Sequence, residues 1–271
     1  MAQDTRQAGR RLALVTGASS GIGRELGTVF AREGWDLVLV AEDPDIERAA
    51  RELSALGTTC EAIVADLATR EGVEAVAARF GADRRAPDAV ALNAGIGLGG
   101  AFLDQELDRI FELIALNVTG TVHLAHRILP GMVARGEGRV LFTSSIAARM
   151  PGAFQAVYNA SKAFVQSFAE ALRNELKDTG VTVTALQPGA TETEFFARAG
   201  MEDTQVGQQD KANPQDVARQ GYEAMMAGKG HVIAATLKER VMAAPSLVTP
   251  GPVKAEQHRR MAEPGSGSGS T

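Results

Sequence analysis

The sequence predicts an α/β protein built on a single-domain, doubly wound parallel sheet of about seven strands with helices on both faces. Short apolar runs, each the length of a strand buried on both faces, recur at 12–16, 36–41, 62–65, 89–92, 139–143, 181–186 and 231–235. Longer amphipathic segments separate these runs, as is typical of strands joined by helical crossovers. A glycine-rich turn at 17–23 joins the first run to the first of these segments.

Helices are expected between the strands. The first three cover 21–33, 46–56 and 70–80, and the second and third end at Gly57 and Gly81. A long helix is expected over 104–135, with an irregular turn near its start, and another over 156–178. The second of these carries an apolar stripe expected to face the core, formed by Phe164, Phe168, Leu172 and Leu176.

The chain is expected to divide into four parts. Residues 1–10 form a flexible leader, 11–236 the main domain, 237–264 a C-terminal extension and 265–271 a disordered Gly/Ser tail. Within the extension, 237–244 is a possible helix, followed by Pro245, Pro250 and Pro252 and then the basic stretch 258–260. We expect the extension to pack near a cleft or a subunit boundary, with a tail along the surface as the alternative.

Composition excludes several classes of function. A net charge of -5 argues against a nucleic-acid partner, and no run of about 18 apolar residues predicts a membrane span. A single cysteine, Cys60, fits a reducing compartment, so a cytoplasmic protein is expected. His123 and His126 lie one helical turn apart but lack acidic or cysteine partners nearby in sequence, so no metal site is expected.

Tyr158 and Lys162 are the first candidates for chemistry. Residues four apart on a helix project from one face, so the phenol and the ammonium group would share one small volume. A nearby cation favours the phenolate, which would lower the tyrosine pKa from its ordinary value of about 10. Such pairs are also common on ordinary helix surfaces, so further sequence features must support a catalytic role.

The glycine turn supplies that support. Gly17, Gly21 and Gly23 allow a tight turn and a close approach to a pyrophosphate at a helix N-terminus, which predicts a Rossmann-type nucleotide-binding fold. The spacing differs from Gly-x-Gly-x-x-Gly and lacks the Gly-Lys-Ser/Thr of a P-loop, so an ATPase or kinase is disfavoured.

A set of motifs in this order resembles the short-chain dehydrogenase/reductase family over residues 12–236. The motifs are 16–23, Asn93-Ala-Gly95, Asn117, Ser145, Tyr158 with Lys162, and Pro188-Gly189. The resemblance implies an enzyme, an NAD(P)-dependent oxidoreductase that transfers a hydride between the nicotinamide and a carbonyl or alcohol. A catalytically silent dinucleotide sensor or scaffold on the same fold is the alternative. A hydrolase is disfavoured because Ser145 lacks a Gly-x-Ser-x-Gly elbow.

The resemblance implies four catalytic residues. Tyr158 would be the general acid/base, and Lys162 would lower its pKa and hold the nicotinamide ribose. Ser145, thirteen positions before the tyrosine, would bind the substrate oxygen, and this spacing rejects Ser144. Asn117 would help retain a water near the lysine, and it could also bend its helix by a hydrogen bond to the backbone.

The resemblance also implies the cofactor contacts. They are Gly17, Ser19, Ser20, Gly21, Ile22, Gly23, Glu42, Asp66, Leu67, Asn93, Ala94, Gly95, Tyr158, Lys162, Pro188, Gly189, Thr191 and Thr193. Asp66 could equally cap the next turn, and Asn93 could be structural. Thr193 would hold the carboxamide, with Thr191 second. A short helix over 194–200 would cover the substrate with Phe195 and Phe196, which could instead be ordinary packing.

NAD is the expected cofactor, with NADP as the alternative. Glu42 and Asp43 follow the second strand, where they would repel a 2′-phosphate. Arg24 or Arg48 could still reach such a phosphate, and Ala41 stands where NAD-preferring relatives most often carry Asp.

The expected partner is a small apolar carbonyl or alcohol, because the segments that would line its pocket contain Ile96, Met150, Phe154 and Phe195 and few charges. The resemblance also implies a homodimer or homotetramer through the two long helices, with Phe111, Val122 and Ala125 as possible contributors. Their alternative role is in the core.

Overall fold

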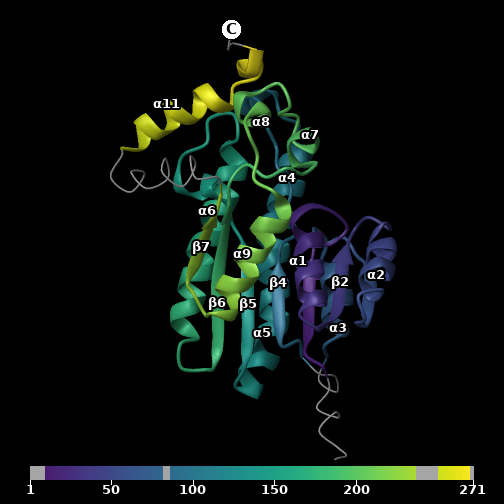
Figure 1. Ribbon diagram of the computed structural model, residues 1–271. Helices are drawn as coiled ribbons and strands as arrows, with labels where there is room; N and C mark the ends of the chain where they lie inside the picture. Colours follow the sequence, from purple (N-terminus) through teal and green to yellow (C-terminus); the bar gives the residue numbers. More distant parts are fainter. Residues whose placement is uncertain (1–9, 82–85, 236–249, 269–271) are drawn as a thin grey trace, which may run out of the picture.

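The computed structural model describes residues 10–81, 86–235 and 250–268. Its centre is a seven-stranded, fully parallel sheet in the order β3-β2-β1-β4-β5-β6-β7 (Figure 1). The strands are β1 Leu12–Thr16, β2 Asp36–Ala41, β3 Cys60–Val64, β4 Ala89–Leu92, β5 Gly138–Thr143, β6 Val181–Pro188 and β7 His231–Ala234. The predicted Rossmann-type, doubly wound fold is confirmed.

Helices cover both faces of this sheet. One face carries α1 Gly21–Arg32, α2 Ile46–Ser54 and α9 Pro214–Met226, and the other carries α3 Arg70–Ala78, α5 Thr121–Arg135 and α6 Ala156–Glu175. Two shorter helices, α7 Phe195–Arg198 and α8 Gln205–Gln208, follow β6, and α11 Gly251–Ala262 lies beyond β7. Figure 1 shows α7, α8 and α11 gathered at one end of the sheet, beyond the carboxyl ends of the strands.

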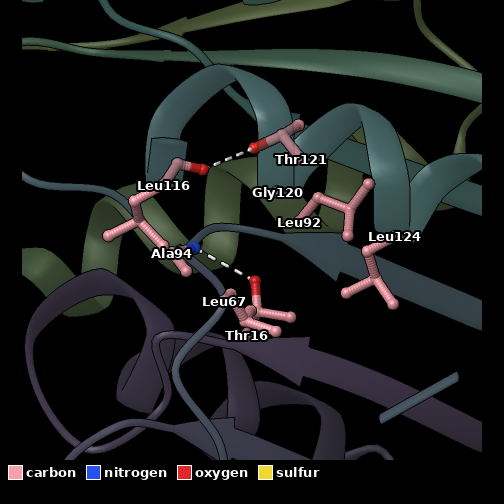
Figure 2. Close-up of a pocket in the computed structure, with 8 residues that line it drawn as sticks. All are labelled: Thr16, Leu67, Leu92, Ala94, Leu116, Gly120, Thr121 and Leu124. Carbon is pink, nitrogen blue, oxygen red and sulfur yellow. Dashed lines mark hydrogen bonds between the residues drawn. The ribbon is translucent and has the colours of Figure 1, made fainter. Parts of the chain in front are cut away.

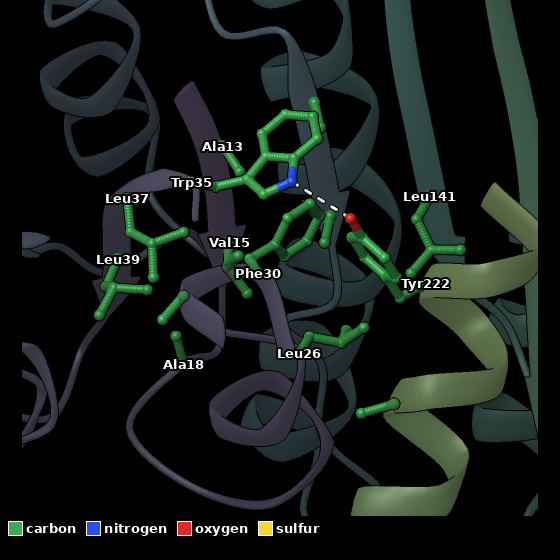
Figure 3. Close-up of a cluster of buried hydrophobic side chains, with 14 of the residues drawn as sticks. Ala13, Val15, Ala18, Leu26, Phe30, Trp35, Leu37, Leu39, Leu141 and Tyr222 are labelled. Carbon is green, nitrogen blue, oxygen red and sulfur yellow. Dashed lines mark hydrogen bonds between the residues drawn. The ribbon is translucent and has the colours of Figure 1, made fainter. Parts of the chain in front are cut away.

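Each face has its own hydrophobic core, because successive strand residues point to opposite sides. In β2, Leu37 and Leu39 pack with α1 and α2, while Val38 and Val40 pack on the opposite face. Figure 3 shows the centre of the first core, where the Trp35 indole donates to the Tyr222 hydroxyl at 3.2 Å. The ring of Phe30 lies edge-on to both, at 5.2 and 5.1 Å between ring centroids.

The strand order reverses between β1 and β4. The chain adds β2 and β3 on one side of β1, and then returns to place β4 on the other side. In open parallel sheets a ligand binds outside the carboxyl ends of the strands at such a switch point. The segments after β1, β4, β5 and β6 meet at this edge, and they contain nearly all of the predicted site residues.

The predicted helix over 104–135 is wrong as a single element. A 3₁₀ turn at Phe102–Asp104 precedes α4 Leu107–Ile114, and a π-helical segment, η2 Ala115–Gly120, joins α4 to α5. The irregularity therefore falls around Asn117 as well as at the start.

The predicted apolar stripe of α6 holds for three of its four residues. Phe168, Leu172 and Leu176 pack against the core, whereas Phe164 is 42% exposed and stacks on Phe168 from outside. The stripe is thus correctly placed but one position too long.

The C-terminal part also differs from expectation. Pro250 and Pro252 do not prevent a helix: Pro252 lies in the first turn of α11, where a missing backbone N–H costs nothing. Residues 266–268, expected in a disordered tail, form a 3₁₀ turn that contacts α8. Residues 1–9 of the predicted leader, the possible helix at 237–244 and residues 269–271 lie outside the described residues.

Candidate active site

The glycine turn after β1 is tightly folded against the helix that follows it. A Cβ atom on Gly23 would lie 2.0 Å from the Gly17 carbonyl oxygen, and Gly17 and Gly21 have left-handed φ angles of 66° and 55°. Ser20 is the N-cap residue of α1, yet its side chain makes no capping hydrogen bond. The free N–H groups of the first turn therefore suit the pyrophosphate of a dinucleotide.

Asn93 joins three strands at the switch point. Its amide donates to the Thr16 carbonyl at 3.2 Å and accepts from the Thr143 hydroxyl at 3.0 Å. The Thr16 hydroxyl in turn accepts from the backbone N–H groups of Asn93 and Ala94, at 2.9 and 3.0 Å. Asn93 therefore has a structural role in holding β1, β4 and β5 in register, which was the alternative predicted for it.

The turn containing Asp66 and Leu67 follows β3. The Asp66 carboxylate accepts from the Ala68 N–H at 2.8 Å, so one of its oxygens caps the turn as the alternative interpretation predicted. Leu67 and Ala94 line a cavity of about 10 Å³ with Thr16 and η2 (Figure 2). That space is about the size of one water molecule, so the cavity is a packing gap and not a ligand site.

Asn117 lies in the π-helical segment and is fully buried. Its Oδ1 accepts from the Ile96 N–H at 2.9 Å, and its Nδ2 donates to the Ile96 carbonyl at 2.9 Å and to the Ser161 hydroxyl at 3.1 Å. The predicted bond from Asn117 to backbone is therefore made to the loop after β4, not to its own helix. Asn117 therefore connects the π-helical segment, the loop after β4 and α6.

Ser145 and Tyr158 are brought together by β5 and α6. The Ser145 hydroxyl lies beside the Tyr158 phenol, whose pKa it lowers, and both side chains are buried. The same hydroxyl accepts from the Ala147 N–H at 3.1 Å and donates to the Pro188 carbonyl at 3.5 Å. Ser144 points elsewhere and donates to the Lys162 carbonyl at 3.0 Å. The structure therefore pairs the tyrosine with Ser145, the serine that the spacing had selected.

Lys162 lies near Tyr158 and the end of β5. Its ammonium group donates to the Thr143 carbonyl at 3.0 Å and lies 5.9 Å from the centroid of the Tyr158 ring. A Cβ atom on Gly95 would lie 3.2 Å from Nζ and 2.9 Å from the Asn117 Oδ1, so the absence of a side chain at 95 leaves this junction open. Lysine, asparagine and tyrosine thus meet beside the loop after β4.

The pKa shifts in this pair run against expectation. Burial raises the pKa of Tyr158 to about 12, and the hydrogen bond from Ser145 offsets only part of that rise. Burial also lowers the pKa of Lys162 to about 8. The predicted lowering of the tyrosine pKa by Lys162 is therefore not found in the cofactor-free chain, because burial disfavours the charged phenolate.

The segment after β6 closes the other side of the site. The Thr193 methyl group would meet a Cβ atom on Gly21 at 3.1 Å, so this threonine faces the glycine turn. Thr191 is more deeply buried, and its hydroxyl donates to the Gly189 carbonyl at 3.0 Å. Of the two candidates for the carboxamide, Thr193 is the one beside the glycine turn.

The short helix α7 covers the tyrosine. The Phe195 ring lies 5.2 Å from the Tyr158 ring and 5.4 Å from that of Phe196, and a Cβ on Gly97 would lie 2.4 Å from Phe195. The Ala199 carbonyl accepts from the Gly99 N–H at 2.9 Å. The helix therefore rests on the loop after β4, over the predicted substrate position.

Acidic side chains after β2 and on α2 form ion pairs with two nearby arginines. Arg24 pairs with Glu52, and Arg48 pairs with Asp45 at 2.6 Å and with Glu52 at 3.7 Å. The Asp43 carboxylate accepts from the Asp45 N–H at 2.9 Å. Both arginines that could have approached a 2′-phosphate are thus bound to carboxylates.

The arrangement is shared with a known family. A family model described as short chain dehydrogenase matches residues 11–204. The chain belongs to the short-chain dehydrogenase/reductase family. The residues of the glycine turn and of the lysine pocket fit a nicotinamide dinucleotide.

Individual relatives agree with this assignment. A probable oxidoreductase, EphD, of Mycobacterium tuberculosis is 38% identical over 71% of this chain. The match covers 33% of EphD, so the chain spans about a third of the length of the first curated relatives.

Two solved structures are similar over nearly their whole length. A short-chain dehydrogenase from Sphingobium yanoikuyae in complex with NADPH has a TM-score of 0.78 and 31% identity, with 88% of this chain and 93% of that chain covered. A bulky-bulky ketone specific alcohol dehydrogenase from Comamonas testosteroni has a TM-score of 0.75 and 27% identity, with 88% and 91% covered.

Among the residues described, no group of three His, Cys, Asp or Glu side chains could hold a metal ion. His123 instead contacts Glu74 at 2.8 Å. No helix in the described ranges is long and apolar enough to cross a membrane.

Three participants were missed in the sequence. The Ser161 hydroxyl links Asn117 to the Tyr158 carbonyl, to which it donates at 2.7 Å, and its place one turn after the tyrosine was an available signal. The Thr143 carbonyl and the backbone of Ile96 had none, because any residue supplies these groups. Such contacts depend on how the strands and loops meet.

The buried pair should make stability depend on pH. Between about 8 and 10.5 the unfolded chain keeps a proton on Lys162 that the folded chain has released, so the free energy of unfolding rises with pH. From about 10 to about 12 the folded chain keeps the Tyr158 proton, so that free energy falls. Urea unfolding of the cofactor-free protein at fixed pH should show the rise vanish in Lys162→Met and the fall vanish in Tyr158→Phe. A Lys162→Met variant with the wild-type slope above pH 8 would contradict the assignment.

Proposed function

We propose that the chain transfers a hydride between a nicotinamide and a secondary alcohol or ketone, with Tyr158 as the general acid/base. The observation that carries this proposal is the buried group of Ser145, Tyr158 and Lys162 at the switch point of the sheet. A bound nicotinamide dinucleotide supplies the hydride in reduction and accepts it in oxidation.

The side chains have distinct tasks in reduction. The Ser145 hydroxyl binds the substrate oxygen, and the Tyr158 phenol gives its proton to that oxygen as the carbonyl carbon gains the hydride. The high pKa of Tyr158 keeps the phenol protonated at pH 7, which is the form that donates. The Lys162 cation stabilises the resulting phenolate, and its remaining N–H donors are available to ribose hydroxyls.

Asn117 positions this group. Its side chain already forms three hydrogen bonds, and two of them are to the Ile96 backbone. We propose that Asn117 fixes the loop after β4 beside Lys162. We also propose that it helps to retain a water molecule near the lysine.

We propose that the substrate is an apolar and bulky carbonyl compound. The walls over Tyr158 are aromatic or aliphatic, with Phe195 beside the phenol and Phe154, Phe196 and Met201 in the adjoining cluster. The similar enzyme from Comamonas testosteroni is described as bulky-bulky ketone specific, which supports the same class here.

We propose NAD as the preferred cofactor. Glu42 is exposed directly after β2, and Arg24 and Arg48 are paired with carboxylates. A 2′-phosphate would meet the Glu42 charge without a free cation from these two arginines to balance it. The Sphingobium yanoikuyae relative is described in complex with NADPH, so the preference rests on these charges and not on family membership.

A homodimer is proposed through α4 and α6. Large apolar side chains lie exposed on these helices, with Leu107, Phe111 and Ile114 on α4 and Phe164 on α6. Scattered exposed apolar residues are ordinary, but a group of this size on adjacent helices is typical of an interface. Ala125, predicted as a possible contributor, is buried in the core of its own chain instead.

Replacement of Tyr158 by Phe should abolish turnover and preserve cofactor binding, because the ring remains while the transferable proton is lost. We expect kcat to fall roughly 10²-fold or more. NADH binding, followed by nucleotide fluorescence, should change little. A variant that keeps wild-type turnover would rule out Tyr158 as the acid/base, and a wild-type protein that binds NADH but converts no carbonyl or alcohol would favour a sensing role.

Glu42→Gln should improve binding of NADP⁺ roughly 3- to 10-fold with a smaller change for NAD⁺, because one repelling charge is removed. Glu47→Gln is the matched control, since Glu47 is a nearby exposed acid on α2 that pairs with Arg51. Titrations with both oxidised cofactors would measure the ratio. Equal gains in the two variants would mean that Glu42 does not face the ribose.

Phe111→Glu should shift the protein toward a monomer, because a charge on a side chain that is 57% exposed would be buried in the proposed interface. Leu56→Glu is the control, with 45% exposure and a place beyond α2 on the opposite face of the sheet. Light scattering at matched concentration gives the mass. If Phe111→Glu leaves the mass of a wild-type dimer unchanged, the interface lies elsewhere.

A further inference from the structure

The C-terminal segment 250–268 lies outside the part of the chain that matches the family model, which ends at residue 204. Figure 1 shows α11 beyond the carboxyl ends of the strands, on the side of α6 and β7, reaching toward α8. Its contacts are with two segments, the loop before α6 and the helices that follow β6.

The first set of contacts is with the loop at 149–154. The His258 Nδ1–H donates to the Ala153 carbonyl at 2.9 Å, and the Lys254 ammonium group donates to the Arg149 carbonyl at 3.4 Å. The Arg259 guanidinium lies over the Phe154 ring, 5.1 Å from its centroid. His258 is only 6% exposed, so its bond to the loop is shielded from water.

Phe154 has an unusual backbone conformation. Its φ angle of 61° is left-handed, and it is the only non-glycine residue with a positive φ in the described ranges. A bulky residue in this conformation is strained and persists only when its surroundings hold it there. His258 bonds the carbonyl immediately before Phe154 and Arg259 covers its ring, so α11 supplies part of that hold.

The second set of contacts is with the segment after β6. Ala262 is buried in one cluster with Phe196, Ala199 and Met201, against which Phe154 and Phe195 also pack. The Gly265 N–H donates to the Asp203 carboxylate at 2.7 Å, and the Ser266 hydroxyl accepts from the Gln205 N–H at 3.0 Å. The same segment therefore joins the loop before α6 to the helices α7 and α8.

These contacts connect segment 250–268 to Tyr158, the catalytic residue of the proposed function, through the apolar cluster. Phe195 lies against Tyr158, and Phe154 belongs to the same apolar cluster. We propose that segment 250–268 determines substrate size, with His258 as a positioning residue that fixes Phe154 as one wall of the carbonyl pocket. The inference rests on the proposed function, because the pocket is the one that Tyr158 would serve.

An ordinary packing role for α11 would predict a different pattern of contacts. A helix that only stabilises the fold would be held by buried apolar side chains alone, such as Ala262. In α11, hydrogen bonds also go to backbone carbonyls of the loop, and the Arg259 cation lies over the strained Phe154. They act on the conformation of a pocket wall.

The experiment compares kcat and KM for a series of apolar ketones of increasing size in His258→Leu and His258→Asn. Leucine removes the donor, whereas the Asn Nδ2–H stands near the position of the His Nδ1–H and should restore the bond. We expect His258→Leu to change the ratio of kcat/KM between the largest and smallest ketones roughly 3- to 10-fold, mainly through KM. His258→Asn should return toward the wild-type ratio.

Two further variants separate positioning from stability. Arg260→Gln breaks a helix-surface ion pair with Glu256 that matches the Arg259–Glu263 pair in spacing. The Arg260 side chain is 77% exposed, and its ion pair is made within α11, so this variant should leave the size ratio unchanged. If His258 acts through Phe154, the double variant His258→Leu with Phe154→Ala should show the ratio of Phe154→Ala alone. Thermal unfolding and NADH binding of each variant show whether it is folded.

The outcomes are distinct. Wild-type activity with the same size ratio in folded His258→Leu would overturn the inference and leave the proposed function standing. Additive effects in the double variant would also overturn it, since His258 would then act independently of Phe154. A wild-type protein that reduces no ketone and oxidises no alcohol, yet binds NADH, would instead overturn the proposed function.

Discussion

The burial of a lysine is the constraint on which the candidate active site depends. Within the described residues Lys162 forms no ion pair, and the hydrogen bond found for its ammonium group is to the Thr143 carbonyl. A buried cation without a carboxylate is costly, and its pKa falls to about 8 as a result. The same dry surroundings raise the pKa of Tyr158, so both groups are driven toward their neutral forms and neither is neutralised by a permanent partner.

Two asparagine side chains, each with several partners, hold the scaffold around this pair. Asn93 holds β1, β4 and β5 together, and Asn117 joins the π-helical segment to the loop after β4 and to Ser161 on α6. Asn93 directly follows the carboxyl end of β4, and Asn117 lies in the π-helical segment. A network that is fully bonded in a low-dielectric region tolerates little displacement, and this is what positioning for proton transfer requires.

Much of the fold and the membership of the site could be predicted from the sequence. Strands buried on both faces carry a strong local signal. The thirteen-residue spacing selected Ser145 as the site serine, and Ser144 instead bonds to the Lys162 carbonyl. The direction of the tyrosine pKa could not be predicted, because it depends on a competition between burial and a nearby charge that only the packed structure decides. The prediction for Phe164 failed because its spacing continues the stripe, whereas its side chain is 42% exposed and stacks on Phe168 outside the core.

The C-terminal segment was the part least accessible to sequence reasoning, and its contacts explain why. It has no motif, and its proposed effect on the pocket depends on the backbone carbonyl of Ala153 and the φ angle of Phe154, neither of which has a local sequence pattern. The chemistry of the site is set by the sheet edge, where every distance is fixed by paired strands. The walls over Tyr158 come from loops and short helices, so a helix that bonds these walls could change which carbonyl the proposed pocket admits without moving Tyr158, the proposed proton donor.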